Sequence, residues 1–115
     1  MPQEPLVIED FAGPKDGQRV LRLNGPLVLS NLFDFQAKVR ANQSRALLLD
    51  FTNVPYVDSA GIGALVGAYV THQKEKRGLY LIGVSQRVHD ALTVTRVQQF
   101  FTFFDTPAAA EQANL

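Results

Sequence analysis

Short apolar stretches and longer amphipathic stretches follow one another along the chain, a pattern typical of alternating strands and helices. Five stretches fit strands, because they are β-rich or continuously apolar: residues 5–11, 18–25, 46–51, 79–84 and 100–104. Four stretches fit helices, because they show helical spacing or begin with capping residues: residues 31–42, 60–76, 85–94 and 106–113. A turn-rich loop joins the first two strands, whereas helices join the later ones. We therefore predict an α/β fold with one mixed, mostly parallel sheet, an antiparallel N-terminal strand pair and about four helices.

Individual residues predict where these helices begin and end. Ser30, Ser85 and Thr106 each precede a helical stretch and offer a side-chain oxygen as an N-cap. Pro107 suits the first position of the last helix. Gly78 follows a basic turn, so we expect it to end the second helix.

The second helix has two unlike faces. One face is apolar and is expected to pack on the sheet, with Ile62, Leu65, Val66, Tyr69 and Val70. The other face carries small residues, namely Ala60, Ala64, Gly67, Ala68 and Thr71. Glycine on a solvated helix face costs about 1 kcal/mol relative to alanine. Either another element of the same domain packs closely there, or the face is exposed and a partner docks on it; we favour the exposed partner surface.

The composition narrows the class of protein. The 115 residues suffice for one domain, residues 1–115, and 46% hydrophobic with 19% charged residues is typical of a globular chain. Eleven basic residues balance eleven acidic ones without a basic run, which speaks against nucleic-acid binding. The absence of cysteine excludes disulfides and thiol chemistry. Without a signal-peptide pattern or an apolar run near the ~20 residues of a membrane span, we expect a cytoplasmic protein with no membrane insertion.

The candidate chemistry lies at Asp58 and Ser59, directly before the second helix. A nucleophilic serine needs a base and an oxyanion site, and Val57 stands where the nucleophile elbow requires glycine. Of the two histidines, His72 lies within the helix and His89 is expected on a surface, so neither is placed to serve Ser59. No phosphate-binding loop is present either. We therefore expect no catalytic residue, cofactor or metal site, while helix capping and phosphorylation both remain compatible with the pattern.

The stretch "ALLLDFTNVPYVDSAGIGALVGAY", residues 46–69, closely resembles the signature of STAS domains, the family of bacterial anti-sigma factor antagonists and of sulfate-transporter tails. The pattern is an apolar strand ending in Asp, a short turn, and then Asp-Ser, a small residue and two glycines separated by an apolar residue. The matching positions are Asp50, Asp58, Ser59, Ala60, Gly61, Ile62, Gly63 and Leu65.

This resemblance implies a phosphorylation-controlled binding module. In antagonist members of the family, the serine at the position of Ser59 is phosphorylated by a serine kinase that doubles as the anti-sigma factor, and a phosphatase reverses the modification. The partner surface implied here comprises Asp58, Ser59, Ala60, Gly61, Gly63, Ala64, Gly67, Ala68 and Thr71.

The chain departs from the family pattern at two places. Pro26 and Val28 stand in "GPLVLSN", where the family commonly has an acidic residue near the serine, and Arg96 interrupts a Leu-Thr-Gly-Leu-like step. Loss of that acidic residue removes charge from the expected docking surface of the kinase. The alternative is therefore a constitutive STAS subunit of a transporter or signalling scaffold without a phosphorylation cycle.

Overall fold

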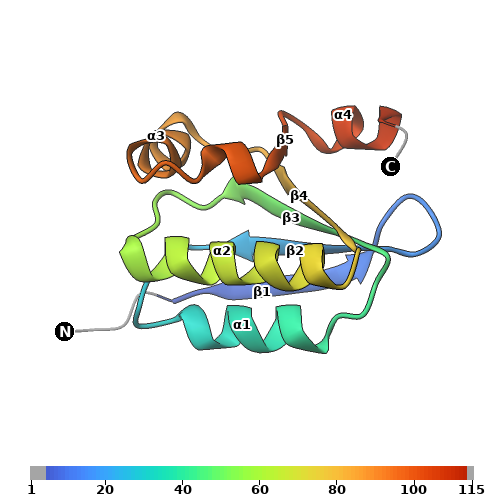
Figure 1. Ribbon diagram of the computed structural model, residues 1–115, viewed down its shortest axis with the longest axis horizontal. Helices are drawn as coiled ribbons and strands as arrows, with labels where there is room; N and C mark the ends of the chain where they lie inside the picture. The colour runs from blue at the N-terminus through green and yellow to red at the C-terminus, as the bar shows by residue number, and fades with distance from the viewer. Residues whose placement is uncertain (1–4, 114–115) are drawn as a thin grey trace.

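A computed structural model describes residues 5–113 and contains one five-stranded sheet, with the strands in sequence order. The strands are β1 (Val7–Ala12), β2 (Gln18–Asn24), β3 (Ala46–Asn53), β4 (Gly78–Ile82) and β5 (Thr102–Phe104). β1 pairs with β2 in antiparallel fashion and every later pair is parallel, so the predicted fold class is confirmed (Figure 1). The last strand is shorter than predicted, because residues 98–100 form a 3₁₀ turn before it.

Four α-helices connect or follow the strands: α1 (Leu32–Ala41), α2 (Ser59–Lys74), α3 (Gln86–Val94) and α4 (Pro107–Gln112). The predicted caps Ser85 and Thr106 are confirmed, since each side-chain oxygen accepts a backbone N–H of its helix. Ser30 is not a cap: Asn31 takes the N-cap position of α1, and its side chain binds the preceding loop.

The prediction for the end of α2 is wrong. The helix ends at Lys74, and Lys76 has the left-handed backbone conformation (φ 58°) that lets the chain turn toward the sheet. Gly78 is instead the first residue of β4, where a Cβ atom would overlap the ring of Tyr80.

The larger core lies between the sheet and α1, α2 and α3. Leu21, Leu49 and Leu81 occupy one cross-strand row on this face and are fully buried. Phe35 of α1 and Leu65 of α2 are both fully buried in the same core. Figure 1 shows α1 and α2 side by side and running in the same direction, as right-handed crossovers between parallel strands require.

A smaller core lies on the opposite face of the sheet. Val20, Leu48 and Ile82 meet Ala110 of α4 there. Beside them, Asp50 is only 3% exposed and pairs with Arg22, whose Nε lies 3.2 Å from Asp50 Oδ2. The other carboxylate oxygen accepts the backbone N–H of Thr52 at 2.9 Å. The buried Asp50 carboxylate thus accepts hydrogen bonds from residues of both β2 and β3.

We predict that Asp50→Ala lowers the free energy of unfolding by about 1–3 kcal/mol, because it removes a buried carboxylate that accepts hydrogen bonds from both the Arg22 guanidinium and the part-buried Thr52 N–H. Arg22 retains its contact with Glu9, which limits the loss. The matched control is Asp10→Ala, which removes an exposed ion pair with Arg19 and should cost less than about 1 kcal/mol. Urea unfolding of both variants measures the difference, and equal losses would contradict a special role for the buried carboxylate.

Candidate partner-binding site around Ser59

Asp58 is the N-cap of α2 and joins two parts of the chain. Its Oδ1 accepts the backbone N–H of Gly61 at 2.8 Å, and its Oδ2 accepts the backbone N–H of Leu29 at 3.0 Å. The backbone N–H of Asp58 in turn donates to the Leu27 carbonyl at 3.3 Å. Both oxygens of this carboxylate are therefore engaged in holding the β2–α1 loop against the start of α2.

Ser59 is the first residue of α2 and its side chain is exposed. Within residues 5–113 its hydroxyl makes no hydrogen bond, so the cap role belongs to Asp58 alone. The first backbone N–H groups of a helix lack intrahelical partners and carry partial positive charge. A phosphate on this hydroxyl would therefore lie at a favourable helix terminus and in solvent.

The described histidines are not arranged as a base for Ser59. His72 lies thirteen residues along the same helix, about 20 Å away at the rise of an α-helix. The ring of His89 packs edge-on against Phe103, with centroids 5.2 Å apart. Within residues 5–113, neither histidine is hydrogen-bonded to the Ser59 hydroxyl, as the base of a nucleophilic serine would be.

The small-residue face of α2 is only partly exposed, which corrects the expectation for three residues. Ala64 and Ala68 are 7% and 6% exposed. They lie against α1, which packs on this side of α2. Gly61 is also buried, because its Cα faces the Leu27 carbonyl so closely that a Cβ would overlap the oxygen. For these three residues, packing within the domain explains the small side chains.

The rest of that face is open. Gly63, Gly67 and Thr71 are exposed and Ala60 is partly exposed. A Cβ at Gly63 or Gly67 would have no neighbour within 4 Å. No contact among the described residues 5–113 therefore requires glycine at these two positions.

The buried face of α2 is rotated by part of a turn relative to the predicted apolar face. Ile62 and Leu65 are buried as predicted, but Val70 is 54% exposed. His72, which the spacing did not assign to the core, is 1% exposed. The buried arc of α2 is wider than a sheet contact alone requires, because α1 covers a second side.

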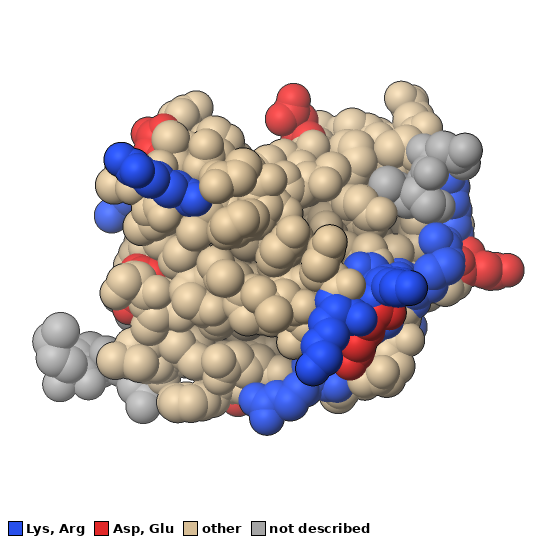
Figure 2. Space-filling model, viewed as in Figure 1, with Lys and Arg blue, Asp and Glu red and all other residues tan. Residues whose placement is uncertain are grey.

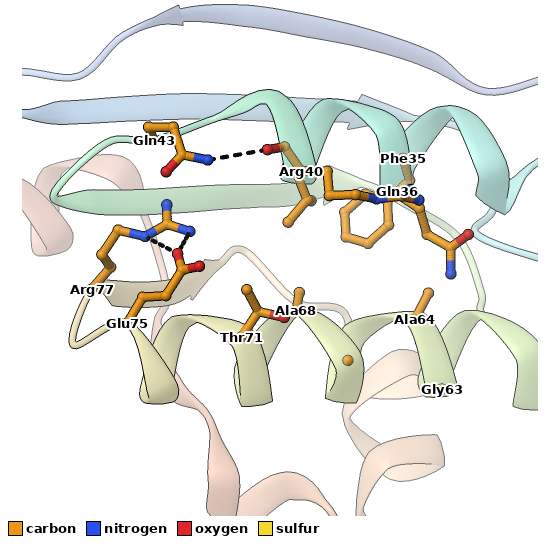
Figure 3. A pocket seen from close by; sticks show the side chains of 12 residues that line it. Phe35, Gln36, Arg40, Gln43, Gly63, Ala64, Ala68, Thr71, Glu75 and Arg77 are labelled. Atoms are coloured by element: carbon orange, nitrogen blue, oxygen red, sulfur yellow. Dashed lines mark hydrogen bonds and ion pairs between the residues drawn. The ribbon is translucent and has the colours of Figure 1, made fainter.

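A groove runs along the junction of α1 and α2, with a volume of about 320 Å³ (Figure 3). Ala64 and Ala68 lie on the α2 side, and the side chain of Gln36 extends from α1 toward Ala64. Glu75 and Arg77 form an ion pair at the end of the groove near the C-terminus of α2. Figure 2 shows Lys and Arg side chains gathered toward this end, whereas the surface over the N-terminal half and the middle of α2 is uncharged.

Two exposed apolar side chains near Ser59 escaped sequence reasoning. Leu29 is 63% exposed and belongs to the loop held by Asp58. Phe33 is 70% exposed in the first turn of α1. Val28 is only 8% exposed, so its side chain points inward. The surface beside Ser59 is thus apolar where an acidic residue was expected, and only the unbroken apolar run "PLVL" hinted at it.

The family-level comparison agrees with this geometry. The fold and the Asp-Ser turn at the start of α2 define a STAS-type domain, and the STAS domain model matches residues 13–110. The chain belongs to the STAS domain family.

A curated relative and several solved structures are similar to this chain. The anti-sigma-B factor antagonist of Staphylococcus aureus (strain NCTC 8325 / PS 47) is 32% identical over 57 residues, which are 50% of this chain and 53% of the relative. The chain thus matches about half the length of this curated relative. A putative anti-sigma factor antagonist from Thermotoga maritima has a similar structure, with a TM-score of 0.76, 18% identity and coverage of 95% and 92% of the two chains.

Two further structures share the fold. The phosphorylated form of the Bacillus cell fate determinant SpoIIAA has a TM-score of 0.69 at 15% identity and covers 94% of this chain and 98% of that chain. The murine anion transporter Slc26a9 has a TM-score of 0.76 at 20% identity and covers 95% of this chain but 22% of the transporter. At these identities the likeness shows the fold alone. In residues 5–113, none of the helices is both long and apolar enough to cross a membrane.

We predict opposite effects of alanine at three glycines of α2. Gly63→Ala and Gly67→Ala should each raise the free energy of unfolding by up to about 1 kcal/mol, because alanine is the better helix former and the space is open. Gly61→Ala should lower it by more than about 1 kcal/mol, because the methyl group overlaps the Leu27 carbonyl. Thermal and urea unfolding compare the three variants. A destabilised Gly67→Ala protein would show that this face is packed internally.

We further predict a pH dependence of stability from His72. Burial lowers the pKa of His72 below its usual 6.5; the nearby Arg77 lowers it further, while the contact with Ala68 and the charge of Glu75 oppose the shift. Its Nδ1 lies 2.8 Å from the Ala68 carbonyl oxygen, and Nε2 has no partner within residues 5–113. The unfolded chain binds a proton below about pH 6.5 and the folded chain resists it, so stability falls as the pH decreases, by at most about 1.4 kcal/mol per pH unit.

Urea unfolding between about pH 7.5 and 5.5 measures this slope. This window lies above the usual pKa values of Asp and Glu, so carboxylates contribute little to it. His72→Gln should flatten the slope in this window, and the partly exposed His89→Gln control should keep it. An unchanged slope in His72→Gln would contradict the assignment.

Proposed function

We propose that this chain is a cytoplasmic anti-sigma factor antagonist that acts by binding rather than catalysis. Its unmodified form binds an anti-sigma factor through the surface around Ser59, and phosphorylation of Ser59 by that partner, acting as a serine kinase, ends the binding. A phosphatase restores the unmodified form. The observation that carries the proposal is an exposed, unbonded Ser59 hydroxyl at the first position of α2, beside an exposed face without internal contacts.

The physical basis is a modification that changes the surface and leaves the fold unchanged. A phosphoserine carries about −1.5 to −2 charges at neutral pH, and a helix N-terminus tolerates them. Because Asp58 already caps the helix, the Ser59 side chain is free to react. The phosphate would add charge and bulk next to Ala60 and Gly63, where a partner needs close contact.

The proposed contact surface differs from the set named by the family pattern. Ser59, Ala60, Gly63, Gly67 and Thr71 form its exposed part. Leu29 and Phe33 extend it with apolar area, the kind of surface that marks protein interaction sites. Asp58 and Gly61 contribute indirectly, by holding the β2–α1 loop in place, while Ala64 and Ala68 contribute through the packing of α1 on α2.

One observation favours a second candidate, a constitutive STAS subunit of a larger assembly. Val28 faces the interior and Leu29 faces solvent, so the surface beside Ser59 lacks the acidic residue that the family commonly presents there. The similar structure within the anion transporter Slc26a9 shows that this fold also occurs as part of a much longer chain. The two candidates differ in whether Ser59 is modified.

We predict that the ATP-binding anti-sigma factor of the same organism transfers one phosphate to this chain, at Ser59. Intact-mass measurement after incubation with ATP should show one added phosphate on wild type and none on Ser59→Ala, with Ser85→Ala, the exposed Ser30→Ala and Thr71→Ala as controls that remain modified. Isothermal titration should show that Ser59→Asp weakens binding of this partner at least ten-fold, while the melting temperature stays within a few degrees, because the charge lies in solvent.

The outcomes separate the two candidates. Binding without phosphate transfer, with Ser59→Asp binding as tightly as wild type, would favour the constitutive subunit. Phosphate on Thr71 or Ser85 in place of Ser59 would contradict the site assignment. No binding by any form would contradict the proposed partner.

A further inference from the structure

The exposed side of α2 is uncharged over nearly its whole length. No Lys, Arg, Asp or Glu occurs from Ser59 to Gln73. Gly63, Gly67 and Thr71 are exposed along this side, and Val70 adds exposed apolar surface at 54%. Gly63 and Gly67 lie one helical turn apart, so another helix can approach the backbone closely there.

The two ends of this side carry opposite electrostatic character. Near the C-terminal end of α2, the side chains of Arg40, Lys74 and Lys76 are exposed and form no ion pair within residues 5–113 (Figure 2). The N-terminal end holds the Asp58 carboxylate and the Ser59 hydroxyl. A second α2 laid antiparallel on the first would therefore bring the Asp58 carboxylate of each copy near the basic end of the other, with the two helix dipoles aligned favourably.

We propose that the occupant of this face is a second copy of the same chain, with the two α2 helices antiparallel around a two-fold axis that passes near Gly67. Gly67 lies close to the middle of α2, which spans Ser59–Lys74, so a two-fold axis there brings uncharged surface onto uncharged surface. Symmetry then places each N-terminal end against the basic end of the other copy, as an isologous interface requires. The adjacent groove of about 320 Å³ between α1 and α2 gives the second helix room to settle.

This arrangement gives Ser59 a second role. With the axis at Gly67, Ser59 of one copy lies opposite residues 74–76 of the other, where Glu75 is already paired with Arg77 and Lys74 and Lys76 have no ion pair within residues 5–113. A negative charge on Ser59 strengthens the pairing, whereas it weakens contact with any partner that lacks those lysines. Phosphorylation of Ser59 would then act in two ways: the phosphate itself would block the partner, and the strengthened dimer would cover the same face of α2. The dimer itself does not depend on the anti-sigma factor or on the proposed function.

Sedimentation equilibrium of the purified chain, over about a hundred-fold range of concentration up to about 1 mM, tests the dimer. Wild type should show a reversible monomer–dimer equilibrium. Gly67→Arg and, independently, Thr71→Arg should raise the dimer dissociation constant at least ten-fold while circular dichroism and the melting curve remain those of a folded protein. The control Val94→Arg introduces the same side chain at an 80% exposed position on α3 and should leave the equilibrium unchanged.

Charge exchange tests the antiparallel orientation. Ser59→Asp should lower the dimer dissociation constant several-fold at low salt, and adding Lys74→Glu and Lys76→Glu should remove that gain. Ser59→Lys combined with the same two glutamates should restore it, because the charges then pair in the reverse sense. A chain that is monomeric throughout, a dimer insensitive to Gly67→Arg and Thr71→Arg, or one that Val94→Arg disrupts equally would overturn the proposal. A dimer that responds to the arginines and not to the charges would overturn its orientation.

Discussion

The site depends on one carboxylate, Asp58, which fixes the start of α2 and the neighbouring loop in a single arrangement. Its two oxygens bind N–H groups from Gly61 and from Leu29, residues that are far apart in the sequence. The Leu27 carbonyl accepts the backbone N–H of Asp58 from the same side. An N-cap of this kind contributes about 0.5–2 kcal/mol to helix stability. Here it also determines which residues surround Ser59, because Leu29 is held by the same group.

The same contact explains why the motif has the form Asp-Ser-x-Gly. Aspartate is needed for two simultaneous acceptors, and glycine is needed because the Leu27 carbonyl leaves no space for a Cβ at Gly61. The serine between them has no structural partner within the described residues. Asp58 and Gly61 therefore build the turn, whereas Ser59 can be modified without loss of a structural contact. Modification of such a residue alters a surface without removing any interaction that stabilises the fold.

Much of this architecture could be predicted from the sequence, because each strand and cap has a local cause. The apolar run at residues 46–51 predicted a strand, and Ser85 and Thr106 predicted helix starts. The details that failed depend on contacts between distant segments. Asn31 displaced Ser30 at the start of α1 because its side chain binds the loop from Pro26 to Val28. Val70 was predicted to be buried and is exposed, whereas His72 was not assigned to the core and is buried. The reason is that a helical wheel assumes one packing partner, whereas α2 packs against both the sheet and α1.

The roles of the small residues of α2 also depend on contacts between distant segments. Sequence alone offered internal packing and an exposed interface as alternatives for the whole set, and the structure divides the set between them. Ala64 and Ala68 are small because α1 lies against them, whereas Gly63 and Gly67 face open space and cost helix stability. Packing of α1 buries one edge of the small-residue face and leaves the other edge as an uncharged surface beside the groove between the two helices. A partner that lies on this surface meets few side chains that must be ordered, so little conformational entropy opposes its binding. Since no contact within residues 5–113 requires glycine at positions 63 and 67, the stability that these glycines cost is best explained by a surface that approaches them from outside.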